Sequence, residues 1–313
     1  MTLLTLTFAA CGGGDDPPLP AEQVRVATGQ RGGVYRVYGK ALADLVNRYL
    51  PPLRASAQET QGSVENLQRL GDGRADVAFT LADSAAPALR GTRPFSRPIR
   101  LAALAHLYDD YVQVIARASS HLKTITDLHG RTVSIGPPRS GTALTATRIL
   151  ELPGLGLRGA RAPRILRLPL RASANALAAG RIDAFFWSGG LPTNAIVDLK
   201  RMMLKRKQPI RWLALPARTA EHLDPNLYAE TVIPQFVYGP EGAVRTVTAA
   251  NLLVVRKDLP NAVAFRLTGL LFEHQSELER AHQEARRLNK GAAITTYPLD
   301  LHPGAARWYR ENP

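Results

Sequence analysis

The sequence predicts an α/β protein with two similarly built lobes, and three observations support this class. Apolar runs of strand length alternate with segments of helical periodicity, which is typical of a parallel sheet covered by helices. Two glycine-rich loops each stand between such a strand and such a helix. Finally, similar blocks recur along the chain, because GRADVAF from Gly73 resembles GRIDAFF from Gly180.

The first copy begins with the strand-like run VRVAT (24–28), followed by a glycine loop. Apolar residues then recur at helical spacing from Val34 to Tyr49 and stop before two prolines. The second copy repeats this order, with TVSIG (132–136) as the strand, PPRS as the loop and a helix continuing to Leu150. In each copy a short amphipathic helix, SVENLQRL or SANALAAG, precedes the Gly-Arg-spacer-Asp block and a buried strand. We therefore expect two equivalent lobes, over 24 to about 112 and about 118 to 225; chance similarity of common α/β pieces is the alternative.

Length and charge narrow the class of protein further. A chain of 313 residues that is 45% hydrophobic can form two lobes, each with its own core. A formal charge of +14 raises nucleic acid as a partner, yet Lys and Arg are scattered, and only RMMLKRK (201–207) is locally dense. A solvated helix face explains that segment better than a nucleic-acid or membrane patch, so we expect no nucleic-acid partner.

The N-terminal segment has the features of a secreted, anchored protein. The short apolar run LLTLTFAA leads to Cys11, the only cysteine, and GGGDDPPLP follows. Phe8 to Cys11 resemble the lipobox of bacterial lipoproteins, which implies lipidation of Cys11 and membrane association through it. We therefore interpret 1–21 as signal, lipobox and tether; an N-terminus with an incidental cysteine is the alternative. No later stretch reaches the roughly 18 apolar residues that a membrane span requires.

The two glycine loops predict an anion-binding cleft. Each loop opens a helix at the carboxyl end of a strand, where open α/β sheets bind their ligands. A helix start presents unpaired backbone N–H groups, and glycine lets an anion approach them closely. Ser140 and Thr142 add hydroxyl groups, and Arg139 adds a charge that suits a carboxylate. The alternative is that Ser140 only caps the helix and Arg139 is solvated.

Five segments in this order resemble the TAXI family of extracytoplasmic solute receptors, which serve TRAP (tripartite ATP-independent periplasmic) transporters. The segments are TGQRGGVY (28–35), TQGSVENLQRLGDGRADVAF (60–79), GPPRSGTALTATRIL (136–150), GRIDAFFWSGGLPTNAI (180–196) and LHPGAARWYRE (301–311). The resemblance implies a periplasmic-binding-protein fold of type II, with two α/β lobes joined by crossing strands around a ligand cleft. One lobe would comprise 22–112 plus 252–313 and the other 113–251. The runs 111–118 and 251–258 are the expected crossings, and 274–290 is expected to form one amphipathic packing helix.

The resemblance also implies a function. The protein would capture a small organic anion or amino acid, such as glutamate, by lobe closure and deliver it to ion-gradient-driven TRAP membrane subunits. It would lie outside the cytoplasmic membrane and use no cofactor and no metal. A ligand-binding receptor for a sensor system without transport is the alternative. We do not expect an enzyme, because the sequence contains no HExxH and no GxSxG, and the glycine loop TGQRGGVY that directly follows the first strand lacks the GxGxxG spacing.

Carried over to this sequence, the family's motif implies a set of ligand-binding residues: Thr28, Gly32, Gly33, Val34, Tyr35, Thr60, Gly62, Ser63, Asn66, Ser140, Gly141, Thr142, Trp187, Pro192 and Thr193. Arg139 joins this set as the position where the chain departs from the family, because it replaces the glycine expected before Ser-Gly-Thr. Other roles stay open for some members. Core packing suits Tyr35 and Trp187, helix capping suits Ser63, and backbone hydrogen bonding suits Asn66.

Overall fold

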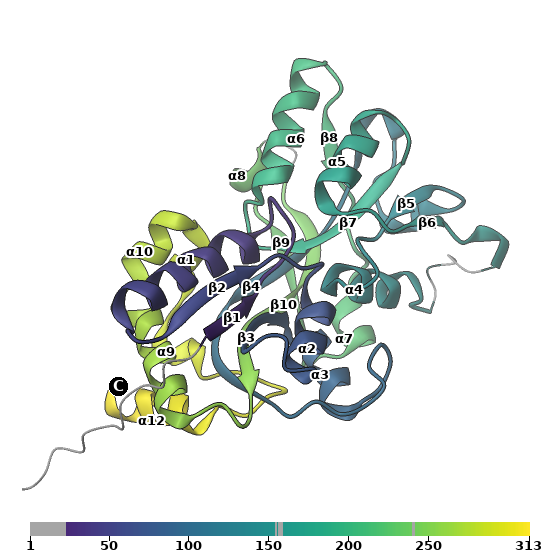
Figure 1. Cartoon of the computed structure of the whole chain (residues 1–313). Helices are drawn as coiled ribbons and strands as arrows, with labels where there is room; N and C mark the ends of the chain where they lie inside the picture. The colour runs from purple at the N-terminus through teal and green to yellow at the C-terminus, as the bar shows by residue number, and fades with distance from the viewer. Residues whose placement is uncertain (1–22, 154, 156–158, 240–241) are drawn as a thin grey trace, which may run out of the picture.

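A single mixed sheet runs through both lobes of the computed structural model, which describes residues 23–153, 155, 159–239 and 242–313 (Figure 1). Its main path is β2-β1-β3-β10-β4-β7-β5-β6, with β8 beside β4 and β9 beside β10. The strands are β1 (Gln23–Ala27), β2 (Arg54–Gln58), β3 (Val77–Leu81), β4 (Leu101–Arg117), β5 (Thr132–Ser134), β6 (Arg164–Leu166), β7 (Ala184–Gly189), β8 (Ile210–Trp212), β9 (Tyr228–Ile233) and β10 (Val244–Arg256).

Helices cover both faces of this sheet (Figure 1). The α-helices are α1 (Val34–Tyr49), α2 (Ser63–Gly71), α3 (Ala82–Arg90), α4 (Gly141–Leu150), α5 (Leu170–Ala178), α6 (Asn194–Lys205), α7 (Thr219–Leu223), α8 (Gln235–Tyr238), α9 (Asn261–Glu273), α10 (Gln275–Ala281), α11 (Lys290–Ala293) and α12 (Pro303–Glu311). Short 3-10 turns are η1 (Ala118–Ser120), η2 (Ile125–Leu128), η3 (Gly159–Arg161) and η4 (Gln283–Arg287).

Two long strands connect the lobes. β4 pairs antiparallel with β10 from Leu101 to Tyr111, and then with β7 from Tyr111 to Ala116. β10 pairs with β3 near its C-terminal end and with β9 near its start. The expected crossings at 111–118 and 251–258 overlap these two strands. We call the half with β1, β2 and β3 the first lobe, and the half with β5, β6 and β7 the second lobe.

The sequence repeat corresponds to a structural repeat. β3 lies parallel beside β1, and β7 lies parallel beside β5. In the first lobe the Asp76 carboxylate accepts the backbone N–H of Arg25, and in the second the Asp183 carboxylate accepts that of Thr132, both at 2.8 Å. The Asp of each Gly-Arg-spacer-Asp block therefore fixes the edge of the neighbouring strand. This explains why both blocks have Asp at the same place.

Amphipathic helices build the core on both sides of the sheet. α1 buries Tyr38, Leu42 and Val46 against the sheet, where Tyr38 meets Phe79 at a ring-centroid distance of 5.6 Å. On the opposite face, α2, α3 and α4 bury a second set of apolar side chains that continues from one lobe into the other. α5 and α6 bury a third set in the second lobe. Burial of this kind is the main stabilising contribution to such a fold.

The expectation of one helix over 274–290 is wrong. α10 ends at Ala281, His282 is extended with φ −153°, and η4 follows. The His282 Nδ1 atom accepts the backbone N–H of Glu284 at 3.2 Å, so a side-chain cap replaces the helical bond that the periodicity favoured. The break turns Glu284 toward the segment after β7, where its Oε1 atom accepts the N–H of Leu191 at 2.6 Å.

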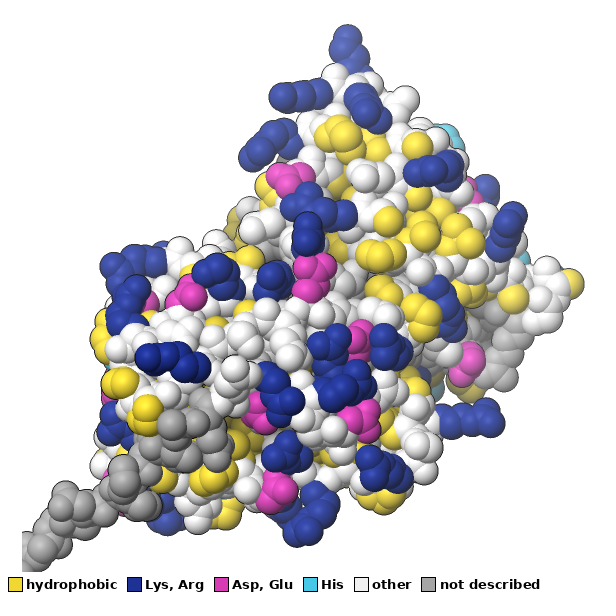
Figure 2. Space-filling model, viewed as in Figure 1, with side chains coloured by type: hydrophobic (Ala, Val, Ile, Leu, Met, Phe, Trp, Pro, Cys, Tyr) yellow, Lys and Arg dark blue, Asp and Glu magenta, His cyan; other side chains and the backbone are white. Residues whose placement is uncertain are grey.

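The face shown in Figure 2 carries Lys and Arg side chains spread over both lobes, with Asp and Glu among them. Within the described ranges, no helix is long and apolar enough to cross a bilayer. The expected signal, lipobox and tether at 1–21, with Cys11, lie outside the described residues.

Candidate ligand-binding site

A cavity lies between the two lobes, where three helices begin and several strands end. It is lined by Gly29, Gln30, Gly33, Val34, Tyr35, Gln61, Gly62, Ser63, Leu81, Tyr108, Asp110, Ser140, Gly141, Thr142, Trp187, Ser188 and Gly189, and we call it the inner cavity. It holds about 390 Å³ of atom-free space. The inner cavity is therefore narrow and suits a small solute.

The helix starts give one side of the inner cavity the character of an anion site. α1, α2 and α4 each point their N-terminal end toward it, through Val34, Ser63 and Gly141. Among the hydrogen bonds of the described residues, none uses the N–H groups of Ser63, Gly141 or Thr142 as donors. Free N–H groups and the positive ends of helix dipoles favour a bound anion.

The hydroxyl groups on this side are already engaged. Ser140 caps α4, since its Oγ accepts the N–H of Ala143 at 3.0 Å and donates to the carbonyl of Pro137 at 2.8 Å. Thr142 Oγ1 accepts the N–H of Ser188 at 3.2 Å, and Ser63 Oγ accepts the N–H of Leu81 at 3.2 Å. These bonds fix the walls. Ser63 and Thr142 act only as acceptors in them, so their O–H groups remain as donors for a solute together with the backbone N–H groups.

Glycine lets the two lobes meet closely at this cavity. A Cβ on Gly141 would lie 2.7 Å from Ser63 Oγ and 2.8 Å from Leu81 Cδ1, both in the first lobe. A Cβ on Gly33 would lie 3.2 Å from Cη2 of Trp187, which belongs to the second lobe. The described conformation is therefore closed, and Gly141 in particular is required for it.

The inner cavity is also lined by groups that can accept hydrogen bonds. Asp110 on β4 is only 3% exposed, and its Oδ1 atom has no hydrogen-bond partner within the described parts of the chain. The same is true of the hydroxyl groups of Tyr35 and Tyr108. Burial raises the pKa of Asp110 well above its ordinary value, and the negative charge of Glu284 raises it further. Burial and then Asp110 likewise raise the pKa of both tyrosines.

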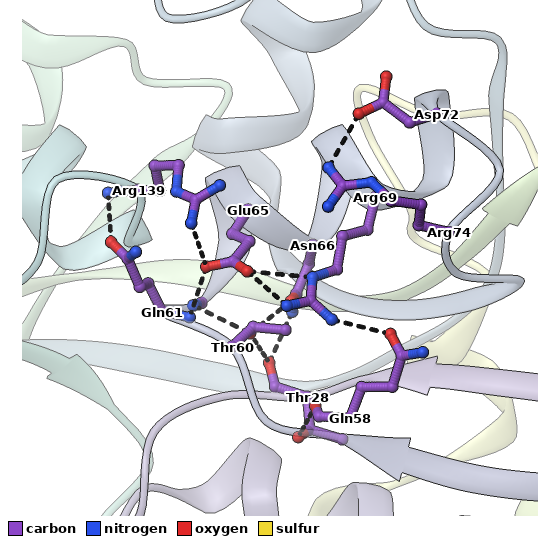
Figure 3. A network of polar contacts seen from close by, with 11 residues as sticks. Thr28, Gln58, Thr60, Gln61, Glu65, Asn66, Arg69, Asp72, Arg74 and Arg139 are labelled. Atoms are coloured by element: carbon purple, nitrogen blue, oxygen red, sulfur yellow. Dashed lines mark hydrogen bonds and ion pairs between the residues drawn. The ribbon is translucent and has the colours of Figure 1, made fainter.

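Three of the expected ligand residues, Thr28, Thr60 and Asn66, hold together the elements around the inner cavity without lining it. Asn66 Nδ2 donates to the carbonyls of Thr28 and Phe79 at 2.6 and 2.7 Å, and Thr60 Oγ1 donates to Asn66 Oδ1 at 2.6 Å (Figure 3). Thr28 Oγ1 in turn donates to the carbonyl of Gln58. This network joins β1, β3 and α2, and none of Thr28, Thr60 and Asn66 lines the inner cavity.

Arg139 also does not line the inner cavity. Its guanidinium contacts the Glu65 carboxylate at 3.3 Å, and its side chain is 44% exposed (Figure 3). Its backbone N–H donates to Gln61 Oε1 at 3.1 Å, and its carbonyl accepts the N–H of Glu65 at 2.9 Å. Arg139 therefore contributes a side-chain contact between the lobes.

Two glutamines separate the inner cavity from a wider opening between the lobes. This opening, which we call the outer mouth, holds about 1250 Å³ of atom-free space and is lined by Gln30, Arg31, Glu59, Thr60, Gln61, Glu65, Pro137, Pro138, Arg139, Arg167, Pro169, Leu170, Arg171 and Ala172. Gln30 and Gln61 line both spaces. Gln30 Oε1 accepts the N–H of Leu170 at 2.8 Å, so each glutamine accepts a backbone N–H from the second lobe.

Two of the other expected residues, Thr193 and Gly32, support Trp187 and the contact between the two lobes. Trp187 lines the inner cavity, and its Nε1 donates to Thr193 Oγ1 at 3.0 Å. Thr193 and its neighbour Pro192 do not line the cavity. Gly32, with φ +87°, faces Ala195 and Arg171 of the second lobe. Thr193 therefore positions Trp187, and Gly32 belongs to the contact between the lobes.

Sequence reasoning missed several lining residues: Gly29, Gln30, Gln61, Leu81, Tyr108, Asp110, Ser188 and Gly189. Gln30 and Gln61 stand inside the motifs already quoted, and Leu81, Ser188 and Gly189 stand at the carboxyl ends of strands. Asp110 could have been predicted from the strand pattern, because adjacent residues of a strand point to opposite faces of the sheet. In the run YDDY of β4, one carboxylate must therefore point inward.

Solved structures define the class of this architecture. The chain is similar to PhnD1 from Prochlorococcus marinus in complex with methylphosphonate (11% identity, TM-score 0.57, covering 85% of this chain and 91% of that one). It is also similar to XAC2383 from Xanthomonas citri bound to ATP (16%, 0.54, 92% and 94%) and to the substrate-binding protein of an amino acid ABC transporter (10%, 0.50, 85% and 100%). The fold is thus that of the type II periplasmic-binding-protein class. A model of the NMT1-like family matches residues 26–312, and the chain belongs to this family.

Proposed function

We propose that this protein is an extracytoplasmic solute-binding protein that captures a small carboxylate-bearing solute in the inner cavity by lobe closure. The observation that carries this proposal is the convergence of three helix starts, with free N–H groups, on a narrow cavity between two lobes. Carboxylates are bound well by such N–H groups. The cavity admits only a small molecule.

The similar structures support the solute class. PhnD1 is complexed with methylphosphonate and XAC2383 is bound to ATP, and both molecules carry anionic groups. A third similar structure is the substrate-binding protein of an amino acid transporter. An organic anion or amino acid, glutamate among them, fits the donors of the inner cavity.

The motif order of the TAXI receptors supports the finer assignment. We propose that the closed, loaded protein delivers its solute to TRAP-type membrane subunits driven by an ion gradient. Lipidation of Cys11 would hold it at the outer face of the cytoplasmic membrane, and the segment GGGDDPPLP would be the tether.

The geometry suggests how capture proceeds. Four arginines, Arg31, Arg139, Arg167 and Arg171, outnumber the two glutamates, Glu59 and Glu65, around the outer mouth, and this excess of positive charge attracts anions. The solute then passes into the inner cavity, and Gln30 and Gln61 bond to the second lobe behind it. Closure removes water, which strengthens each hydrogen bond to the carboxylate.

A thermal-shift screen tests this function. Ligand-free protein, checked by mass spectrometry, is melted with amino acids, dicarboxylates, 2-oxo acids and phosphonates. A solute that binds only the folded state adds roughly 2.7 kcal/mol at about 100 times its Kd, so its melting temperature must rise visibly. If no carboxylate raises the melting temperature, the proposed solute class is wrong.

A further inference from the structure

Asp110 differs from every other buried carboxylate among the described residues. Four acidic side chains are buried: Glu65, Asp83, Asp110 and Glu284. Arg69 pairs with Glu65 at 2.7 Å, Arg148 with Asp83 at 3.4 Å and Arg287 with Glu284 at 2.8 Å. No ion pair joins Asp110 to a described residue, and no Lys, Arg or His lines the inner cavity.

The groups around Asp110 add negative charge, so they do not compensate for the missing cation. The charged groups that act on it most strongly are Glu284 of η4, Asp83 of α3 and its own neighbour Asp109, and these three are acidic. Asn251 on β10 is the polar group that opposes them. A buried carboxylate without a cation is destabilising, because it has lost its water and gained no opposite charge.

The groups beside Asp110 are acceptors that suit an ammonium group. An ammonium is compact and has three N–H donors. The Asp110 carboxylate and the hydroxyl oxygens of Tyr35 and Tyr108 line the same cavity, and both hydroxyls lack a partner among the described groups. The helix starts that line the same cavity offer free N–H donors. The inner cavity thus combines donors for a carboxylate with acceptors for an ammonium group.

We propose that the cation that pairs with Asp110 is the ammonium group of the solute. The solute is then a small zwitterion, such as an α-amino acid, with its carboxylate at the starts of α2 and α4. This inference rests on the proposed function and narrows it. It separates amino acids from the 2-oxo acids and dicarboxylates that the donors alone would accept equally well.

Matched ligand pairs test the inference on the wild-type protein, without a variant. Ligand-free protein is titrated calorimetrically at neutral pH with L-alanine and pyruvate, L-valine and 3-methyl-2-oxobutanoate, and L-glutamate and 2-oxoglutarate. The members of each pair differ at the ammonium position. We expect the amino member of at least one pair to bind tenfold or more tightly than its 2-oxo partner.

Variants then assign the preference to Asp110. Asp110→Asn should lose most of the preference for the amino member, since its side chain keeps the shape and loses the charge. Asp109→Asn is the matched control, because Asp109 is the adjacent acid and its side chain is 52% exposed; it should keep the preference. Removing an unpaired buried charge does not destabilise the unliganded fold, so unliganded Asp110→Asn should melt no lower than the wild type. Thermal melting of each variant therefore checks that it is folded.

The outcomes separate the two proposals. Equal binding of 2-oxo and amino members, or a preference that survives in Asp110→Asn, overturns this inference and leaves the proposed function standing. If the only carboxylates that bind are those without an ammonium group, this inference is likewise overturned and the proposed function stands. Failure of every carboxylate in the wider screen overturns the proposed function and this inference with it.

Discussion

The outer mouth and the inner cavity lie next to each other, yet they carry opposite kinds of charge. Four arginines and two glutamates line the outer mouth, and the inner cavity contains no Lys or Arg among its described residues. The arginines of the mouth are exposed to solvent, whereas Asp110 in the cavity is buried. Charges in water attract over a distance but discriminate weakly, while desolvated groups discriminate strongly. The comparison indicates that attraction and selection of the solute are separate tasks in this protein.

The largest effect should come from a change that damages only the inner cavity. In Gly141→Ala the new Cβ would lie 2.7 Å from Ser63 Oγ and 2.8 Å from Leu81 Cδ1, so the lobes cannot close fully. Overpacking of this kind costs about 1–3 kcal/mol, and we expect affinity to fall about tenfold or more. Calorimetric titration measures the change. Gly291→Ala is the control, because its Cβ would meet only Asn289 Oδ1, at 3.3 Å, and wild-type affinity in Gly141→Ala would refute the closed site.

A smaller effect concerns the pH dependence of stability. The folded pKa of Asp110 is raised above its ordinary 3.8, so the unliganded protein loses stability as pH rises from about 4 through the raised value. Asp110→Asn cannot titrate and should keep that stability. We expect its melting temperature to exceed that of the wild type by about 2–4 °C at pH 8, the shift that about 1 kcal/mol gives, and by less near pH 4.

Glu284, whose pKa is also raised by burial, changes stability in the same direction, but it is present in both proteins. The difference between wild type and Asp110→Asn therefore reports the titration of Asp110 together with its coupling to Glu284. A difference that stays constant between pH 4 and pH 8 would show that Asp110 does not carry an unpaired charge.

The smallest effect is expected in the outer mouth. Arg139→Ala removes a half-exposed ion pair with Glu65, and such pairs contribute about 0–1 kcal/mol. Both backbone hydrogen bonds of residue 139 survive the substitution. Affinity should therefore fall by less than about fivefold, with a slower association at low salt. A loss of fiftyfold in calorimetry would mean that Arg139 contacts the solute after all.

The fold could be predicted well because the chain repeats itself. Helical spacing from Val34 to Tyr49 matches α1, and the two Gly-Arg-spacer-Asp blocks match β3 and β7. The prediction failed at 274–290, where periodicity continues but the His282 side chain caps a new turn. A periodic pattern of apolar residues does not show where a side chain will take the place of a helical backbone hydrogen bond.

The site could be predicted only in part, because a motif shows where loops meet and not which way side chains point. The glycines and Ser140 at the helix starts do line the inner cavity. Thr28, Thr60 and Asn66 have the same polar character, yet they hydrogen-bond to backbone behind it. Asp110 comes from β4, whose contribution depends on the tertiary packing of β10 and α1 around it. No short-range pattern reveals that it lacks a cation.

The central claim is that the solute binds in the inner cavity between the lobes, and Trp187 tests it most directly. Trp187 lines that cavity, whereas Trp212 stacks on Tyr238 and Trp308 on Phe272, outside it. The protein should be titrated with the carboxylate solute that stabilises it most, and its tryptophan fluorescence followed. We predict a saturable change that disappears in Trp187→Phe while calorimetry still detects binding. A full fluorescence change in Trp187→Phe would contradict the account, because the solute would then bind elsewhere.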